Sequence, residues 1–123
     1  MSDYKFNMPW PPTVNHYHQP AIIKGRPRII KGAKARQYAK DAAAHLKSIG
    51  IGGELINERL SISLAIHPPT LAKYDIDNRA KGVFDALSNI GFWVDDEQVD
   101  RLTITKGEKI KGGLVVVSVA KLD

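Results

Sequence analysis

The stretch KYDIDNRAKGVFDALSNIGFWVDDEQVD, residues 73–100, is the most informative part of the chain. From residue 75 to residue 100 it contains seven acidic residues and two basic ones, a local charge near −5, whereas the whole chain has a formal net charge of +5. Its centre has the apolar spacing of an amphipathic helix, in Ala80, Val83, Phe84, Leu87 and Ile90. We therefore predict a helix over about residues 78–90, with acidic groups just before and just after it.

The residues that flank this helix predict where it begins and ends. Asp77 is of the type that accepts hydrogen bonds from the first free amides of a helix, so we predict it as the N-cap. Gly91 is predicted as the C′ residue, because glycine adopts the left-handed conformation that ends many helices.

Outside this stretch, hydrophobic periodicity predicts one more helix and four strands. The helix covers residues 33–49 and ends at Gly50. Strands are predicted at residues 4–8, 60–66, 101–105 and 114–120, and residues 11–32, rich in proline and glycine, are predicted to be a long loop. The order β-α-β-α-β-β predicts an α+β domain (a mixed α/β layer), in which one mixed β-sheet of about four strands carries two main helices.

The length of 123 residues predicts a single domain over residues 1–123. Because the chain has no cysteine, disulfides, thiolate metal sites and cysteine nucleophiles are excluded. There is no apolar run long enough to span a bilayer, and the charged start lacks the apolar core of a signal peptide. We expect a cytoplasmic protein with no membrane partner.

The acidic residues around the predicted helix suggest a metal site. If residues 75–77 are extended, Asp75 and Asp77 point the same way and Ile76 points to the core. Two carboxylates on one side form half of a Mg²⁺ or Mn²⁺ site. The segment after Gly91 is just long enough, at about 3.3 Å per residue, to run back along the helix and bring Asp96, and also Asp95, to the same place.

Lys81 lies one helical turn after Asp77, where it could neutralise a phosphate or orient a water molecule. Each of these features also has a structural alternative. Asp77 could serve only as a cap, Lys81 could form an exposed i,i+4 pair with Asp85, and residues 95–97 could be an exposed turn.

Basic residues concentrate in a different part of the chain, which predicts a polyanionic partner. Eight Lys or Arg residues and one acid lie between residues 24 and 47. The candidate DNA contacts in or beside the long loop are Lys24, Arg26, Arg28, Lys31 and Lys34, together with the polar and aromatic Asn15, His16 and Tyr17. The alternative is a basic loop that is merely solvated.

The chain also resembles a known family. The pattern Asp75-x-Asp77-Asn78, Lys81, Phe84-Asp85-Ala86-Leu87 and Gly91-Phe92-Trp93-x-Asp95-Asp96-x-Gln98-Val99 resembles the RusA family of Holliday junction resolvases, as do Pro9-Trp10-Pro11-Pro12 and Asn15. The resemblance implies a small homodimeric endonuclease that binds four-way junction DNA and cuts paired strands with Mg²⁺.

By the same resemblance, Asp75, Asp77 and Asp96 are the essential metal-binding carboxylates, Asp95 is a contributor and Lys81 is the catalytic lysine. The chain departs from the family in one place. Some members have an arginine-rich run just before the first aspartate, where this chain has a single basic residue, Lys73, over residues 69–74. We keep Lys73 as a candidate DNA contact and expect residues 24–40 to supply most of the others.

Together these features predict a Mg²⁺-dependent, structure-selective DNA endonuclease that resolves Holliday junctions by paired symmetric nicks in recombination and repair. Two alternatives remain at this point. One is a junction-binding or DNA-binding protein that does not cleave, and the other is a less selective Mg²⁺-dependent nuclease that acts on branched DNA. Clustered carboxylates favour an enzyme, because negative charge does not help a protein to bind DNA.

Overall fold

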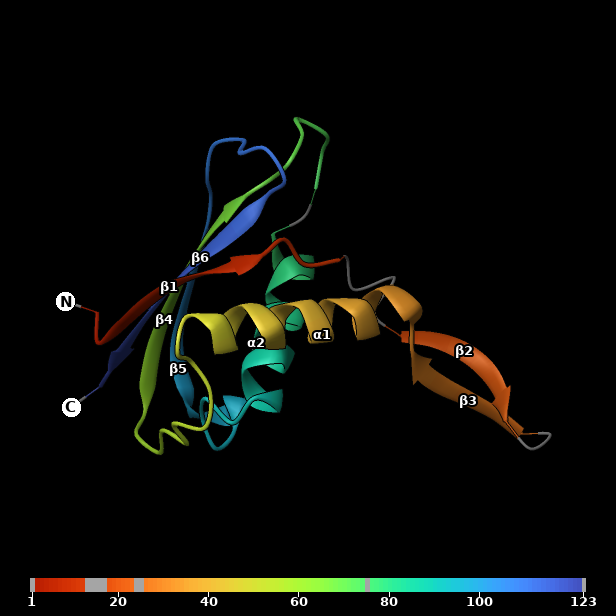
Figure 1. Ribbon diagram of the computed structural model, residues 1–123, viewed down its shortest axis with the longest axis horizontal. Helices are drawn as coiled ribbons and strands as arrows, with labels where there is room; N and C mark the ends of the chain where they lie inside the picture. The colour runs from red at the N-terminus through yellow and green to blue at the C-terminus, as the bar shows by residue number, and fades with distance from the viewer. Residues whose placement is uncertain (1, 13–17, 24–25, 75, 123) are drawn as a thin grey trace.

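The computed structural model describes residues 2–12, 18–23, 26–74 and 76–122 (Figure 1). The elements in chain order are β1 (Tyr4–Pro9), β2 (His18–Ile23), β3 (Arg26–Lys31), α1 (Ala33–Ser48), β4 (Leu60–His67), α2 (Asp77–Asn89), the 3₁₀ turn η2 (Asp96–Gln98), β5 (Val99–Lys106) and β6 (Leu114–Lys121). The predicted α+β class and the order β-α-β-α-β-β of the main sheet and its helices are confirmed. No helix in the described part of the chain is both long and apolar enough to cross a membrane.

The main sheet has four strands in the order β1-β6-β4-β5. β6 is antiparallel to both of its neighbours, and β4 and β5 are parallel, so the sheet is mixed as predicted. The parallel pair is joined by α2, which makes a β-α-β crossover. This connection places the start of α2 near the end of the sheet where β4 and β5 terminate. The turn η2 lies at the opposite end, where β5 begins.

The core lies between one face of the sheet and the two helices. Along β4, Leu60, Ile62, Leu64 and Ile66 are buried, whereas Ser63 on the opposite face is exposed. Val115, Val117 and Val119 of β6 join the same core, as do side chains from both α1 and α2. The strict alternation along β4 and β6 is why these strands were predictable from the sequence.

Both helices end as predicted, with a glycine at C′. In α2 the amide of Gly91 donates to Ser88 O and the amide of Phe92 donates to Leu87 O, which is the Schellman pattern. Gly91 has φ +71°, and Gly50 at the end of α1 has φ +82°. These values lie in the left-handed region that favours glycine.

The predicted start of α2 was wrong by one residue. Ile76, not Asp77, is the N-cap, and with φ −70° and ψ −35° it already has right-handed helical geometry. Ile76 packs against the core as predicted. Because its backbone is helical and not extended, the argument that residues on either side of it point the same way does not apply. Asp77 is the first helical residue, where an acid is still favoured by the helix dipole.

The predicted long loop over residues 11–32 was also wrong. β2 and β3 form an antiparallel hairpin within it, with Ala21 paired to Arg28. Each strand contains a proline, Pro20 or Pro27, which argued against strands in the sequence. A two-stranded ladder has two free edges, where a proline is tolerated. Figure 1 shows the hairpin projecting beyond the N-terminal end of α1, away from the main sheet.

Candidate active site

The acidic turn at residues 95–98 is held by its own hydrogen bonds. Asp95 is the N-cap of η2, and its carboxylate accepts from the amide of Glu97 at 3.2 Å. In return, Gln98 Oε1 accepts from the amide of Asp95 at 2.7 Å, which completes a capping box. The carboxylates of Asp95 and Asp96 are thus carried by a turn of defined shape rather than by a loose loop.

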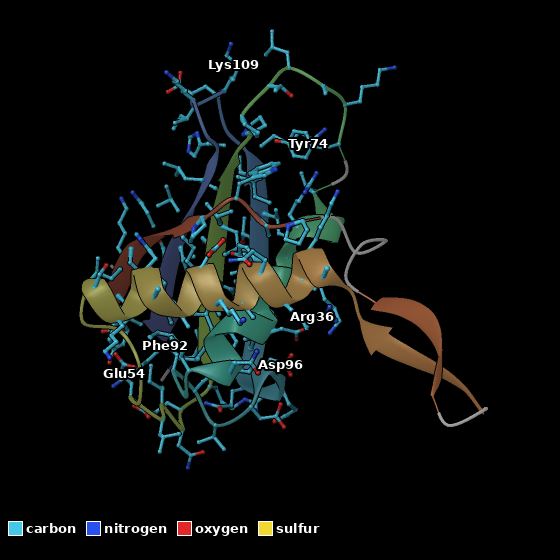
Figure 2. The ribbon with its side chains drawn as sticks, turned by 45° about the vertical axis from the view of Figure 1, so that its right-hand side comes forward. Arg36, Glu54, Tyr74, Phe92, Asp96 and Lys109 are labelled. Carbon is cyan, nitrogen blue, oxygen red and sulfur yellow. The ribbon has the colours of Figure 1, made fainter. Side chains whose placement is uncertain are left out.

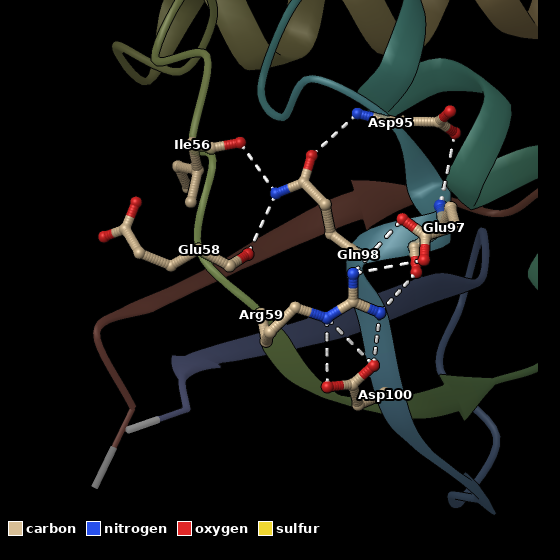
Figure 3. Close-up of polar contacts among 7 residues, drawn as sticks. All are labelled: Ile56, Glu58, Arg59, Asp95, Glu97, Gln98 and Asp100. Carbon is tan, nitrogen blue, oxygen red and sulfur yellow. Dashed lines mark hydrogen bonds and ion pairs between the residues drawn. The ribbon is translucent and has the colours of Figure 1, made fainter.

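Gln98 also ties this turn to the segment that precedes β4 (Figure 3). Its Nε2 donates to Ile56 O at 2.8 Å and to Glu58 O at 2.9 Å. Only 5% of the residue is exposed. Because a buried amide stabilises a structure only when its polar groups are paired, these three hydrogen bonds fix both the side chain and the turn.

Arg59 forms ion pairs with two of the acidic residues of this region, Glu97 and Asp100. Its guanidinium binds the carboxylate of Asp100 and donates to the Glu97 carboxylate at 3.1 Å and 3.2 Å and to Glu97 O at 2.9 Å (Figure 3). Hydrogen bonding to Arg59 lowers the pKa of Asp100. The negative charges of Glu97 and Asp100 are therefore balanced by Arg59. Asp95 and Asp96 remain as the candidate site residues of this turn.

The chain between α2 and η2 runs back along the helix, as predicted. Trp93 is buried, packs edge-to-face on Phe84 with ring centroids 5.4 Å apart, and donates from Nε1 to Ser88 Oγ at 2.7 Å. The amide of Val94 donates to Ile56 O at 3.1 Å. This packing brings Asp96 close enough to α2 to interact with the charges of Lys81 and Asp85.

Asp96 lies in an environment that disfavours its charge. Burial raises the pKa of its carboxyl, a hydrogen bond and the charge of Asp95 raise it further, and the charge of Asp85 acts in the same direction. Lys81 opposes them. The Nζ atom of Lys81 lies 3.2 Å from Asp85 Oδ2, and its charge also acts on Asp96, whose other charged neighbours are the carboxylates of Asp95 and Asp85. The site has an excess of negative charge that a bound cation would offset.

The alternative of an i,i+4 pair between Lys81 and Asp85 is thus present in the structure, and it forms part of the same site. The side chain of Lys81 is half exposed, so its ammonium group remains accessible.

The metal-binding assignment of Asp75, Asp77, Asp95 and Asp96 stays a prediction. Asp75 lies outside the described residues, and for Asp77 the structure describes the backbone but not the side chain. Among the side chains that are described, no group of three or more His, Asp or Glu is arranged to hold a metal ion. The predicted ligands Asp75 and Asp77 are not among these side chains. The donor set is nonetheless the right one, because carboxylate oxygens are the ligands that Mg²⁺ prefers.

The structure places five of the nine predicted DNA contacts, on three segments of the chain. Asn15, His16, Tyr17 and Lys24 are outside the described residues, and Arg26, Arg28 and Lys31 belong to β3, whose backbone alone is described. Lys34 is exposed in the first turn of α1, and Lys73 is exposed just before the start of α2. Their contacts with DNA stay predictions.

Sequence reasoning missed Arg79 as a structural link between the N-terminal segment and α2. Its guanidinium lies 4.6 Å from the ring centroid of Trp10 and donates to Pro11 O. A cation over an aromatic face is attractive, more so when partly desolvated. The signal available in the sequence was the Pro9-Trp10-Pro11-Pro12 segment, whose partner could not be identified without the fold.

A basic α+β domain that holds acidic residues beside a lysine on one helix has the combination expected of a nuclease. Comparison with known proteins agrees. The family model described as endodeoxyribonuclease RusA matches residues 9–119, and the chain belongs to this family.

Individual relatives match over nearly their whole length. A crossover junction endodeoxyribonuclease RusA of Escherichia coli O139:H28 is 32% identical over 124 residues, covering 99% of this chain and 98% of the relative. The proteins of the same name from Enterobacteria phage HK97 and Enterobacteria phage 82 are 30% and 31% identical, with 98% of each relative covered.

Proposed function

We propose that this protein is a Mg²⁺-dependent, homodimeric endonuclease that resolves four-way DNA junctions by paired symmetric nicks. The observation that supports the proposal most strongly is the acidic turn fixed against α2. Asp95 and Asp96 are held in place by Gln98, and they lie beside Lys81 in a family whose relatives are named crossover junction endodeoxyribonucleases. We further propose that the protein acts in recombination and repair, in the cytoplasm.

Asp75, Asp77 and Asp96, with Asp95 as a contributor, would hold the metal. When bound, a Mg²⁺ ion supplies positive charge at the scissile phosphate and lowers the pKa of a bound water. Mn²⁺ prefers the same oxygen ligands and is expected to substitute. The excess negative charge around Asp96 supports a cation in this place, because one lysine does not balance the carboxylates near it.

Lys81 would act on the phosphate directly. Asp85 holds its Nζ atom at 3.2 Å on the accessible side of α2. An ammonium group oriented in this way can stabilise negative charge as it develops on the phosphate or on the leaving oxygen. Asp85 is then a positioning residue, because it acts through Lys81.

A homodimer suits the proposed substrate. A four-way junction has two-fold symmetry, and paired nicks require two active sites related by the same symmetry. Each subunit would supply one acidic site and one set of basic residues.

The test is cleavage of a synthetic four-way junction and of a matched duplex, in Mg²⁺ and in EDTA, by the wild type and by Asp77→Asn. We expect symmetric nicks in the junction that require both the metal and Asp77. Glu54→Gln is a suitable control, because Glu54 is an acid whose side chain accepts from the Gly52 amide, outside the proposed site.

The two alternatives predict different results. Tight junction binding without cleavage, over several junction sequences and in Mn²⁺ as well, would leave a binding protein and contradict the proposal. Equal cleavage of junctions, flaps and duplex would instead indicate a less selective nuclease.

A further inference from the structure

A cleft opens beyond the carboxyl ends of the parallel strands β4 and β5. It is lined by residues 68–74, which lead from β4 toward α2, and by residues 106–109, which follow from β5. Its volume is about 570 Å³. Figure 2 shows Lys109 and Tyr74 at this end of the molecule, on the two segments that form the cleft. In sheets with parallel strands, the carboxyl ends of the strands are a common place for ligands.

The cleft has an excess of positive charge. Lys73, Lys106 and Lys109 line it, with Glu108 as the only acidic residue among the lining residues. None of these lysines forms an ion pair with a carboxylate of the described residues. In contrast, Arg59, Lys81 and Lys121 all have acidic partners. Three lysines that line one cleft, with no carboxylate partner among the described residues, favour binding of an anion.

The wall formed by residues 106–109 is rigidly attached. The amide of Gly107 donates to Ile66 O at 2.7 Å, and the Nδ1 atom of His67 lies 2.9 Å from Glu108 O. The His67 ring packs so closely on Gly107 that a Cβ there would lie 2.5 Å from its Cε1 atom. On the next turn, the amide of Ile110 donates to Pro68 O at 2.9 Å. These contacts hold residues 107–110 against the end of β4.

Aromatic side chains connect the cleft to the start of α2. The Nζ atom of Lys106 lies 4.8 Å from the ring centroid of Tyr74. Tyr74 packs edge-to-face on Trp10, with ring centroids 5.5 Å apart, and Trp10 in turn lies against Arg79 of α2. Tyr74, which lines the cleft, is thus connected through Trp10 to the helix that carries Lys81.

We propose that this cleft binds the phosphate backbone of a DNA arm, with Lys106 and Lys109 as its principal contacts. The inference rests on the proposed function. Residues 69–74 contain a single basic residue, and the fold brings two lysines from the end of β5 to the same place. Lysines contact phosphates without reading base sequence, so the cleft would position DNA rather than select a sequence.

The test measures junction binding as a function of salt, in Ca²⁺ to limit cleavage, for the wild type, Lys106→Ala, Lys109→Ala and the double variant. We expect each single variant to weaken binding by about five- to tenfold at low salt and to reduce the slope of log K against log salt by about 1. The double variant should reduce the slope by about 2. Lys5→Ala is the matched control, because Lys5 is exposed on β1, outside the cleft.

The outcomes separate this inference from the proposed function. Wild-type affinity and slope in the double variant, with junction cleavage intact, would overturn the cleft and leave the proposed function standing. Reduced slopes in the cleft variants alongside a wild type that binds DNA but never cleaves it would support the cleft and overturn the proposed function. Thermal melting of each variant shows whether it is folded, and Lys109→Gln offers a milder replacement on the exposed turn.

Discussion

The acidic turn at residues 95–98 and the basic cleft beside residues 106–109 are constructed in opposite ways. In the turn, nearly every polar group has a partner: Gln98 makes three hydrogen bonds, and Arg59 binds both Glu97 and Asp100. In the cleft, backbone hydrogen bonds hold residues 107 and 110, but no lysine that lines it pairs with a carboxylate of the described residues. The difference suits the two tasks that we propose for these regions. Metal chemistry needs ligands held in position, whereas phosphate binding needs charge that can adapt to a flexible polymer.

The largest expected effect comes from removing one charge within the fixed turn. Asp96→Asn should lower the single-turnover rate of junction cleavage by about 10³-fold or more, because a predicted metal ligand is lost. Junction binding should be unchanged or tighter, since repulsion between the protein and phosphate falls. Both are measured on the same labelled junction.

Glu97→Gln is the matched control for this variant. Glu97 is adjacent in the chain, but its carboxylate faces Arg59, and glutamine can still accept from that guanidinium. A comparable loss of cleavage in Glu97→Gln would contradict the division of the acidic residues into compensated and uncompensated groups.

A smaller effect, on stability as well as on activity, is expected at Gln98. Gln98→Leu should lower the free energy of unfolding by about 2–3 kcal/mol, because it leaves Glu58 O and the Asp95 amide without their partner and removes one of the two donors to Ile56 O. It should also raise the Mg²⁺ concentration needed for half-maximal cleavage, since the turn is no longer held. Urea unfolding and a Mg²⁺ titration measure the two effects.

Gln98→Glu sharpens this prediction. A glutamate can still accept from the Asp95 amide, but it places a carboxylate against two carbonyl oxygens. Its stability should therefore improve relative to the wild type as the pH falls and the carboxyl gains a proton that it can donate. Wild-type stability for both variants would show that the turn is held by something other than Gln98.

The smallest effect is expected at Arg59, whose ion pairs are exposed. Arg59 lowers the pKa of Asp100, so the folded state is stabilised when this carboxylate is ionised. The stabilisation is present above the ordinary Asp pKa of about 3.9 and is lost as the pH falls through the lower value of the folded state. Thermal melts of Arg59→Ala and the wild type should therefore differ at pH 7 and converge in strong acid.

Lys121→Ala is the control for the position of the ion pair. It removes the pair with Glu58 at 3.0 Å, whose carboxyl pKa is also lowered, and should show the same dependence of stability on pH. Only Arg59→Ala should also slow cleavage, because only Arg59 contacts the acidic turn. Equal cleavage by the two variants would count against a positioning role for Arg59.

Local pattern was sufficient to predict the elements whose periodicity is set by a single buried face. β4 alternates strictly, and α2 carries one apolar stripe that ends at a glycine, so both were predicted with nearly correct bounds. The hairpin of β2 and β3 was missed because Pro20 and Pro27 are poor strand residues in a sheet interior, and this hairpin has no interior.

The sequence was sufficient to predict the acidic residues and the lysine of the candidate site, but not the residues that hold them in place. Acidic residues near a lysine could be recognised from spacing along the chain. The residues that hold them could not, because Gln98 bonds to Ile56 and Glu58 across 42 and 40 positions, and Arg59 reaches Asp100 across 41. Contacts of this kind depend on strand pairing, which the sequence pattern does not specify.

The position of β6 has a consequence for how the chain folds during synthesis. This strand is the last element of the chain, yet it lies between β1 and β4 and pairs with both. Until residues 114–121 leave the ribosome, β1 has no partner in the sheet and β4 lacks one of its two neighbours. The pairing of β1 with β6 joins residues more than 100 positions apart, a separation that slows folding. We expect the main sheet to form only after β6 is synthesised. Until then, α1 and α2 are the elements whose backbone hydrogen bonds the nascent chain can form locally.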